Sequence, residues 1–477
     1  MSEELKEQRL KKLERLRSAG VDPYGGRFPS SDTAVSCRED FQPGRPVKVA
    51  GRIFALREHG KSVFADLRDA TGRIQLYFHR DRLGERESLI LSNLDLGDII
   101  GAGGELFHTR TGEVTIQVKE LAILSKALAP LPEKWHGLKD QEIRYRRRYL
   151  DLLVNETTRC VFLIRARAVK GIRRFLDELG FLEVETPMMQ SAVGGAAARP
   201  FVTHMNSLGI DLYLRIAPEL YLKRLLVGGW EKIYELNRNF RNEGLSTRHN
   251  PEFTMLEVYQ AFRDWRDMME LTRDLILEVC RQTLDSLTLP GKEGAIDLER
   301  PWKEISFYSA LRDFTGTDFR SLSKQEVMKE AVRLEIELAP DASRVQVLDQ
   351  VLSRHVQPRL LEPTFITDYP VELSPLAKSR DDDPALAARF ELFIDGMELA
   401  NGYSELNDPI LQRARFREQL ERTRDRGEVD EDFVSALEHG MPPAGGMGLG
   451  IDRLAMVLSG AESIREVILF PQLRPRS

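Results

Sequence analysis

Two blocks of this chain, far apart in the sequence, contain residue types and spacings that suit a nucleotide site. In the later block, residues 446–453, every second position up to Gly450 is glycine, which lets backbone approach a ligand closely. A helix is predicted to begin near Asp452, and a helix start favours anions because its first N–H groups have no partners within the helix. Arg453 adds a forked cationic donor. The sequence contains no Gly-x-x-x-x-Gly-Lys-Ser/Thr run, which excludes a Walker P-loop, and the glycine turn alone is also typical of a structural turn.

The earlier block predicts two paired strands. Residues 234–241 and 252–259 both alternate like strands, and the loop between them is polar and charged, which favours an antiparallel pair. Asn237, Asn239 and Arg241 would then share one face. The returning strand presents on one face Phe253, Met255, Glu257 and Tyr259. An ordinary half-buried strand does not mix an aromatic ring, a carboxylate and a phenol in this way, so we predict a ligand site here.

A third block predicts an acidic hairpin. The Asp-Gly pair at 395–396 is a strong two-residue turn signal between two apolar runs. That turn pairs Phe393 with Glu398, so Glu391 lies diagonal to Glu398 on the same face, at roughly 7–8 Å between α-carbons. Two such carboxylates repel each other unless a cation lies between them, and Mg²⁺ commonly uses one or two carboxylates plus phosphate oxygens. A magnesium site and a solvated acidic hairpin both fit this pattern.

The N-terminal part of the chain predicts a small barrel. Apolar residues alternate in several short runs between residues 47 and 124, which favours five strands of an OB-fold. Phe64 and Gln75 point away from the apolar side, where they could stack on and hydrogen-bond unpaired bases, although an exposed Phe is often without function. Residues 3–18 are predicted to form a helix that ends at Gly20. Its basic side chains are compatible with a solvated surface or with an RNA-facing arm.

With these features the chain resembles the class II aminoacyl-tRNA synthetases, and within them the lysyl-tRNA synthetases, over nearly its whole length. The three class II motifs are matched by residues 180–187, 240–253 and 448–453. Stretches of the lysine type are found at residues 217–224, 248–257 and 401–408. The resemblance implies an α+β protein that combines an N-terminal OB-fold β-barrel with a class II catalytic domain, an antiparallel sheet flanked by helices. The domains expected from it are an N-terminal helical arm (1–40), an anticodon-binding OB-fold (41–128), a linker (129–149) and the catalytic domain (150–477).

The resemblance also implies a reaction and a set of ATP contacts. In the family, the lysine carboxylate attacks the α-phosphorus of ATP, and the tRNA terminal ribose then takes the acyl group. The family roles make Arg241 and Arg453 catalytic, place Phe253 against adenine and assign Mg²⁺ to Glu391 and Glu398. The ATP-binding residues implied are Arg241, Glu243, Arg248, His249, Asn250, Phe253, Glu398 and Arg453.

The lysine contacts implied by the family fall at both ends of the substrate. Gly195 and Glu219 match positions that hold the α-amino group, and Asn401 matches one that holds the carboxylate. Positions that hold the distal ammonium are matched by Glu257, Tyr259 and Glu405, and Arg241, Tyr403 and Gly448 complete the set. Buried carboxylates are costly without a cation, so a substrate without the ammonium is rejected. Tyr403 departs from the Phe of many relatives, and its hydroxyl needs a partner.

For tRNA(Lys), the resemblance implies anticodon contacts from Phe64, Gln75 and Glu120. The side-chain direction of Glu120 is open because the apolar alternation slips between Val118 and Leu121. The helix at 161–179 and the strand at 181–186 form the dimer interface in the family, so a homodimer is expected.

Composition narrows the alternatives. The net charge of −6 leaves nucleic acid binding to local basic patches. The three cysteines are far apart, and no apolar signal or membrane-spanning run occurs, so we expect a cytoplasmic protein that binds no membrane. Three other interpretations fit the residues less well. A paralogue that lysylates a protein lacks the barrel, a catalytically silent RNA-binding relative does not need the intact arginines and glutamates, and Glu257 and Glu405 present the wrong charge for aspartate.

Overall fold

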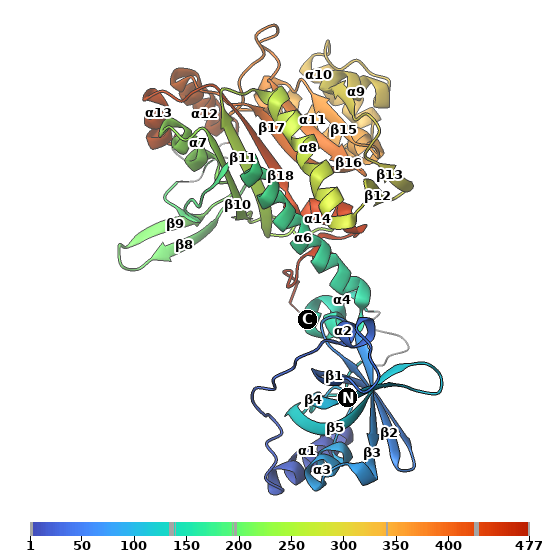
Figure 1. The fold of residues 1–477 in the computed structure, drawn as a ribbon. Coiled ribbons are helices and arrows are strands. Elements are labelled where there is room, and N and C mark those ends of the chain that lie inside the picture. The colour runs from blue at the N-terminus through green and yellow to red at the C-terminus, as the bar shows by residue number, and fades with distance from the viewer. Residues whose placement is uncertain are drawn as a thin grey trace. The chain divides into compact units, whose positions relative to one another are not determined.

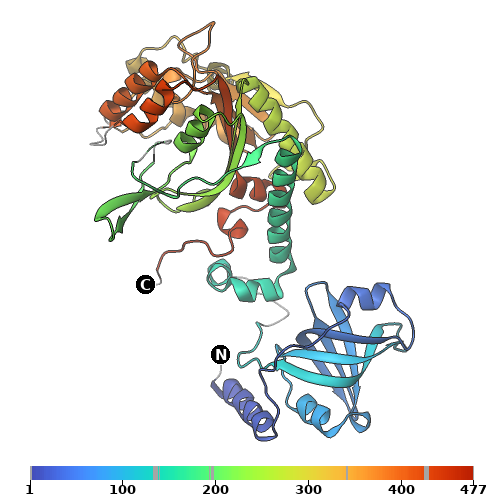
Figure 2. The same cartoon turned by 60° about the vertical axis from the view of Figure 1, so that its left-hand side comes forward.

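The computed structural model describes residues 3–132, 138, 140–192, 194, 198–339, 342–423 and 429–475. The chain divides into two compact units, Met1–Leu138 and Lys139–Ser477. Both units are drawn in Figures 1 and 2. Within the described residues, no helix is both long and apolar enough to cross a membrane.

The first unit is built on a closed five-stranded barrel, which confirms the predicted OB-fold. The strands run in the order β1-β2-β3-β5-β4 around the barrel. Their bounds are β1 Pro46–His59, β2 Ser62–Arg68, β3 Arg73–His79, β4 Ile99–His108 and β5 Val114–Ser125. The helices of this unit are α1 Glu3–Ser18, α2 Ala34–Glu39, α3 Glu85–Ser92 and the short 3₁₀ turn Arg80–Arg82. The apolar residues that alternate in the sequence, such as Val63 and Leu76, fill the interior.

Helix α1 ends as predicted, but part of its basic surface is buried. Gly20 has φ +74°, and the Val21 N–H donates to Leu16 O at 3.0 Å, which closes the helix end. Arg9 is buried and donates to Ala127 O at 2.7 Å. Arg9 therefore ties the helix to its own unit and is not part of an exposed RNA-facing surface.

A β-bulge explains the slip in apolar alternation on β5. Glu120 pairs with Gly103, whereas Val118 pairs with Gly104, so Lys119 is an extra residue on this strand. The bulge leaves the Glu120 side chain exposed, with its Oε2 at 2.6 Å from Lys48 Nζ.

The second unit is built on an eight-stranded, mainly antiparallel sheet. Its order is β14-β15-β16-β17-β18-β11-β10-β6. The strands are β14 Lys303–Ser306, β15 Thr364–Thr367, β16 Arg389–Ile394, β17 Met397–Ser404, β18 Ala444–Gly450, β11 Glu252–Ala261, β10 Lys232–Phe240 and β6 Leu182–Glu183. Two small sheets contain β7 Met189–Gln190, β8 Phe201–Met205 and β9 Ile210–Leu214, and β12 Thr288–Gly291 and β13 Gly294–Asp297. The predicted pair β10 and β11 is confirmed, with Asn239 opposite Phe253.

Helices α6 Glu156–Glu178, α8 Trp265–Leu284 and α14 Ile451–Ser459 cover one face of this sheet (Figure 1). The other helices of the unit are α4 Gln141–Arg146, α5 Arg148–Val154, α7 Glu219–Val227, α9 Phe307–Thr315, α10 Lys324–Arg333, α11 Arg344–Val351, α12 Pro409–Thr423, α13 Glu431–Glu438 and α15 Ile464–Val467. Helices α8 and α14 pack on the central strands, and α6 packs on both helices. Leu256 and Val258 point into this apolar layer, so Glu257 and Tyr259 point to the opposite face of the sheet. The polar side chains of the candidate site therefore lie on the opposite face of the sheet.

The connection into the second unit differs in detail from the sequence expectation. The range expected to be a linker contains α4 and the start of α5. Arg148 is fully buried, donating to Asp151 Oδ2 at 2.6 Å and to three backbone carbonyls, so its guanidinium is not available to RNA. The strand expected at 181–186 is shorter, because only Leu182–Glu183 pairs with β10 before the chain turns away.

Candidate active site

The strand register aligns the candidate residues in one row across the sheet. Glu257 on β11 lies opposite Gly448 on β18, Gly448 lies opposite Asn401 on β17, and Asn401 lies opposite Glu391 on β16. Cross-strand partners share a face, so residues from four strands form a continuous line. This alignment places the predicted lysine and magnesium residues side by side.

Glycines leave β18, the middle strand of the row, without side chains on the face of the site. A Cβ on Gly446 would collide with Glu405 Oε1 and lie 2.6 Å from the Tyr259 ring. A Cβ on Gly448 would lie 3.1 Å from the Met255 methyl group. A side chain at these positions would fill the space between β11 and β17. Glycine instead leaves a trough over β18 that can hold a ligand.

A β-bulge decides which side chains of β17 face the trough. The predicted pairing of Phe393 with Glu398 is confirmed, but the register then shifts by one residue, so that Glu391 pairs with Asn401. Glu398 and Asn401 are three residues apart and would face opposite sides of a regular strand. Because Glu391 and Phe393 share a face of β16, the bulge at Leu399 brings Glu398 and Asn401 to that same face.

One end of the row is an acidic pocket closed by a buried lysine. Lys223 is fully buried on α7, and its Nζ lies 2.8 Å from Glu219 Oε1 and 2.5 Å from Glu405 Oε2. The Tyr403 hydroxyl donates to Glu219 Oε1 at 2.6 Å, which gives this hydroxyl the partner it needs. Tyr259 donates in the same way to Glu257 Oε2 at 2.9 Å. The pocket therefore contains three buried carboxylates held by two phenols and one ammonium.

Burial perturbs the ionisation of this pocket. Burial raises the pKa of Glu257 to about 8, and the negative charge of Glu219 adds to the effect. Burial also raises the pKa of Glu405, opposed by Lys223 and reinforced by Glu219. The carboxylates are thus poorly compensated without a ligand, and a bound cation would stabilise their charged forms. A pocket of this kind selects a cationic side chain.

An ion pair that no pattern in the sequence indicated lies beside the pocket, at β10. Arg215 Nη1 lies 2.6 Å from Glu235 Oε1, and both side chains are buried. Thr186 donates to Glu235 Oε2 at 2.7 Å, so the pair also anchors the chain that follows β6. Because Glu235 lies opposite Glu257, this pair forms the floor beside the lysine pocket.

Arg241 lies between the pocket and the nucleotide residues. Burial lowers its pKa, and the charges of Glu243, Glu398 and Glu257 oppose that shift. Its guanidinium carbon lies 5.1 Å from the centre of the Phe253 ring. Within the described part of the chain, the buried Nε of Arg241 and the Oδ1 of Asn401 have no hydrogen-bond partner. Unpaired buried polar atoms are costly, so both are suited to a bound ligand.

The first turn of α14 carries the second predicted catalytic arginine. Arg453 Nη1 donates to the backbone O of Glu398 at 2.8 Å and to its Oε2 at 3.1 Å. Its Nη2 lies 3.4 Å from His249 Nε2, and the pKa of His249 is lowered by partial desolvation of its ring and by this positive charge. Asp452 accepts from the Thr254 N–H at 2.7 Å, which fixes the helix start against β11.

The carboxylates expected to bind magnesium lie at the far end of the row. Burial raises the pKa of Glu391 to about 7, with Arg389 opposing the shift and Glu398 adding to it. Glu391 accepts from the Tyr369 hydroxyl at 2.7 Å and from Arg389. The described residues contain no cluster of three or more possible ligands that could hold a metal by themselves. A buried carboxylate of raised pKa beside the Glu398 carboxylate fits Mg²⁺ that takes its remaining oxygens from phosphate and water.

The remaining ATP candidates lie in the loop between β10 and β11. Glu243 and His249 are exposed, and Arg248 is half-buried. Asn250 is buried: its Nδ2 donates to Glu252 O at 2.6 Å and its Oδ1 accepts from the Gln472 N–H at 3.3 Å. Through these two hydrogen bonds, Asn250 stabilises the conformation of the loop. Gly195, expected at the α-amino group, lies outside the described residues.

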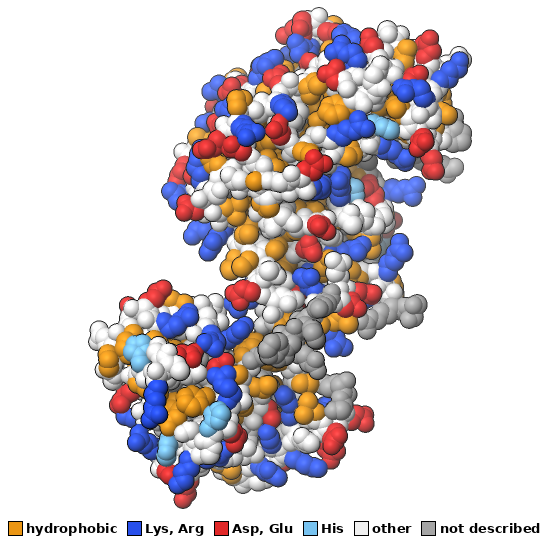
Figure 3. Space-filling view, turned by 90° about the vertical axis from the view of Figure 1, so that its right-hand side faces the viewer, with side chains coloured by type: hydrophobic (Ala, Val, Ile, Leu, Met, Phe, Trp, Pro, Cys, Tyr) orange, Lys and Arg blue, Asp and Glu red, His pale blue; other side chains and the backbone are white. Residues whose placement is uncertain are grey.

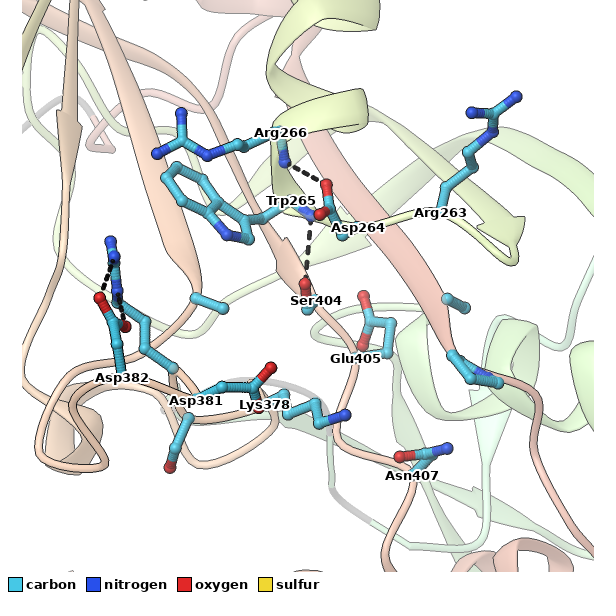
Figure 4. A pocket seen from close by; sticks show the side chains of 15 residues that line it. Arg263, Asp264, Trp265, Arg266, Lys378, Asp381, Asp382, Ser404, Glu405 and Asn407 are labelled. Carbon is cyan, nitrogen blue, oxygen red and sulfur yellow. Dashed lines mark hydrogen bonds and ion pairs between the residues drawn. The ribbon is translucent and has the colours of Figure 1, made fainter.

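A separate cavity of about 340 Å³ borders the acidic pocket at Glu405 (Figure 4). It is lined by the start of α8, by residues 378–382 and by the ends of β17 and β18. The Trp265 N–H donates to Ser404 Oγ at 3.1 Å along one wall. Charged side chains of both signs surround the cavity, so it does not select one kind of charge.

The anticodon candidates lie on the barrel. The Phe64 ring packs 5.0 Å from Tyr77, which packs 5.8 Å from Phe107. Gln75 is buried, accepts from Thr115 and donates to Glu113. Figure 3 shows hydrophobic side chains on this unit surrounded by Lys, Arg and His side chains.

Comparisons with known proteins agree with both units. Residues 140–474 match the family described as tRNA synthetases class II (D, K and N), and residues 47–124 match the OB-fold nucleic acid binding domain. The sheet with its glycine-lined trough, preceded by this barrel, is thus that of a class II tRNA synthetase. Lysine–tRNA ligases of Carboxydothermus hydrogenoformans and Moorella thermoacetica are each 52% identical to the chain, over 99% and 98% of its length and 98% and 97% of theirs. The lysine–tRNA ligase of Dehalococcoides mccartyi is 47% identical over 99% of the chain and 98% of its own length. The chain belongs to the lysine–tRNA ligase family.

Proposed function

We propose that the protein activates L-lysine with ATP to lysyl-adenylate and transfers the lysyl group to the 3′ end of tRNA(Lys). The observation that carries the proposal is the acidic pocket at the end of the row, where Glu219, Glu257 and Glu405 are all buried. Three buried carboxylates with one internal ammonium need further positive charge, and lysine brings two ammonium groups. Aspartate or asparagine brings only its α-ammonium, so at least one carboxylate would remain uncompensated.

The chemistry requires positioning more than a separate nucleophile. The lysine carboxylate itself attacks the α-phosphorus of ATP, and pyrophosphate leaves. The tRNA ribose hydroxyl then attacks the carbonyl carbon, and AMP leaves. Arg241 would neutralise both the carboxylate and the α-phosphate, and Asn401 would donate to the carboxylate from the centre of the row. Holding two anions together in this way lowers the barrier through orientation and electrostatic stabilisation.

The nucleotide lies, in this proposal, over β11 and the start of α14. Phe253 offers a ring face to adenine, Arg453 and Arg248 contact the terminal phosphates, and Glu243 and His249 border the base and phosphates. Glu391 and Glu398 would hold Mg²⁺, which supplies charge neutralisation of the phosphates when bound. The support for this metal is the raised pKa of Glu391 beside Glu398.

For tRNA binding and assembly, we propose the arrangement expected from the family. The arm (1–40), barrel (41–128), linker (129–149) and catalytic domain (150–477) would act as separate parts, with Phe64, Gln75 and Glu120 reading the anticodon. The protein would work in the cytoplasm as a homodimer through α6 and the residues that follow it. Exposed apolar side chains support that interface, since Leu163 is 53% and Met189 is 57% exposed.

Amino-acid-dependent ATP–pyrophosphate exchange tests the proposal. Each common amino acid is offered separately to the purified protein, and lysine is expected to be the one that supports strong exchange. Equal exchange with asparagine or aspartate would overturn the substrate assignment. Charging of tRNA(Lys) transcripts against non-cognate transcripts tests the second step.

A further inference from the structure

The internal lysine of the acidic pocket has a role that the family assignment leaves open. Lys223 lies one helical turn after Glu219 on α7 and spans from it to Glu405, at the end of β17. It is fully buried, its Nζ also lies 3.4 Å from Leu376 O, and it lies 5.7 Å from the centre of the Tyr403 ring. Burying a lysine removes its hydration, so the groups that contact it must compensate for that loss.

Those partners are the two carboxylates proposed to bind opposite ends of the substrate. Glu219 is assigned to the α-amino group and Glu405 to the distal ammonium. A single buried cation therefore touches both recognition groups without belonging to the substrate. A lysine with only a packing role would have no reason to link these two side chains.

The charge count of the pocket depends on Lys223. With Glu219, Glu257 and Glu405 ionised, the pocket carries three negative charges and one positive charge. Two ammonium groups of a bound lysine bring this count to zero, while the substrate carboxylate is left to Arg241. Without Lys223, one of the three carboxylates would have to take up a proton before the same count could balance.

We propose that Lys223 is a positioning and specificity-determining residue that orients Glu219 and Glu405 and holds the negative charge of Glu405, so that the pocket matches a substrate with two ammonium groups. The inference rests on the proposed function, because it takes lysine as the substrate. Lys223 acts through these two carboxylates and not on the reacting atoms.

The charged and titratable groups that face Lys223 and its partners define the expected pH dependence. They are Glu219 on α7, Glu405 and Tyr403 at the end of β17, Glu257 and Tyr259 on β11, Glu235 on β10, and the cations Arg215 and Arg241. Burial raises the pKa of Glu257 and Glu405, and Lys223 opposes this shift for Glu405. Lysine binding to the free protein at pH 7 should therefore release protons, and more of them when Lys223 is absent.

The test compares Lys223→Met with the wild type by calorimetric titration of L-lysine into the full-length protein. Titrations at pH 6.5, 7.5 and 8.5, each in two buffers of different ionisation enthalpy, give both the affinity and the protons released. Each unit by which the pKa of a required carboxylate rises weakens binding about tenfold below that pKa. We expect Lys223→Met to bind lysine at least about tenfold more weakly at pH 6.5, to release more protons, and to approach the wild type as the pH rises.

Two further variants separate this role from folding. Lys223→Arg keeps a cation on the same carboxylates and should retain most of the wild-type pH dependence. Lys126→Met removes a different fully buried lysine, paired with Asp95 and Asp98 in the barrel unit, and should leave the pH profile of lysine binding unchanged.

The outcomes are distinguishable. If Lys223→Met binds lysine with wild-type affinity and proton release, or loses affinity by the same factor at every pH, the inference is overturned. If Lys223→Met does not fold, a Lys223→Arg protein with a pH profile like that of the wild type supports the inference, and one whose affinity falls equally at all pH values overturns it. Wild-type protein that binds no lysine at all would overturn the proposed function, and the inference with it.

Discussion

Glu257→Gln offers the sharpest test of the lysine pocket. Glu257 is buried on β11, faces the trough, and accepts from the Tyr259 hydroxyl. Gln keeps nearly the same shape and can still accept that hydrogen bond, so the substitution mainly removes the negative charge.

The expected loss follows from two opposing contributions. Two unit charges about 4 Å apart interact by about 4 kcal/mol at an effective dielectric constant of about 20. Because the pKa of Glu257 is about 8, ionising it at pH 7 costs the wild type about 1.4 kcal/mol before lysine can benefit. The remaining difference of about 2.6 kcal/mol corresponds to a loss of roughly 80-fold in kcat/KM for lysine.

The sign of the pH dependence is fixed by the same pKa. Below pH 8 the free wild-type carboxyl is increasingly protonated, so the advantage of the wild type should shrink by up to about tenfold per pH unit as the pH falls. Lysine-dependent pyrophosphate exchange from pH 6.5 to 8.5 measures this, with the KM for ATP as internal reference. Glu304→Gln, an exposed carboxylate on edge strand β14, is the matched control. A wild-type KM for lysine in Glu257→Gln, or an equal rise in the KM for ATP, would refute the reasoning.

Four further results are expected. Without ligands, Glu257→Gln should melt at a higher temperature than the wild type at pH 8.5, and this difference should shrink steadily as the pH falls toward about 4.3, because the folded wild type holds a proton up to about pH 8 that the unfolded chain releases near pH 4.3; equal melting temperatures at pH 8.5 would contradict the raised pKa. Glu398→Gln should raise the magnesium requirement for adenylate formation in a single-turnover assay with the fold intact, and an unchanged magnesium titration would remove Glu398 from the metal site. Tyr403→Phe removes a hydroxyl that donates to a buried carboxylate. A hydrogen bond to a charged group contributes about 1.5–3 kcal/mol, so kcat/KM for lysine should fall about tenfold or more. No change in kcat/KM would mean that the bond is not needed. Phe64→Ala with Gln75→Ala should lower kcat/KM for tRNA charging about tenfold or more while pyrophosphate exchange stays at the wild-type level, and a parallel loss of exchange would show that the barrel change had damaged the catalytic unit.

Much of the fold was predictable because its signals are local. The alternation of apolar residues gives the barrel strands, Gly20 ends α1, and the Asp-Gly turn sets the pairing of Phe393 with Glu398. Each of these depends on residues within one turn or one strand. The helices at 141–154 were less predictable, because the burial of Arg148 depends on carbonyl groups contributed by the end of the chain.

The candidate site shows the same division more clearly. The types of its residues were evident in the sequence, and the β10–β11 pair placed Glu257 and Tyr259 correctly on one face. Lys223 carried one available signal, its spacing of four residues from Glu219, which on a helix places both on one side. Nothing local indicates that Glu405, far along the chain, meets the same ammonium.

The sequence by itself determined which groups this protein brings to its site: glycines for a trough, arginines for phosphates and carboxylates for ammonium groups. Only the tertiary structure decided how they are aligned. The bulge at Leu399 turns Glu398 and Asn401 to the same face, β18 lies between β11 and β17, and α7 buries Lys223 between Glu219 and Glu405. The physical reason is that register and burial arise from strands and helices distant in sequence packing against one another, and ionisation in turn follows burial.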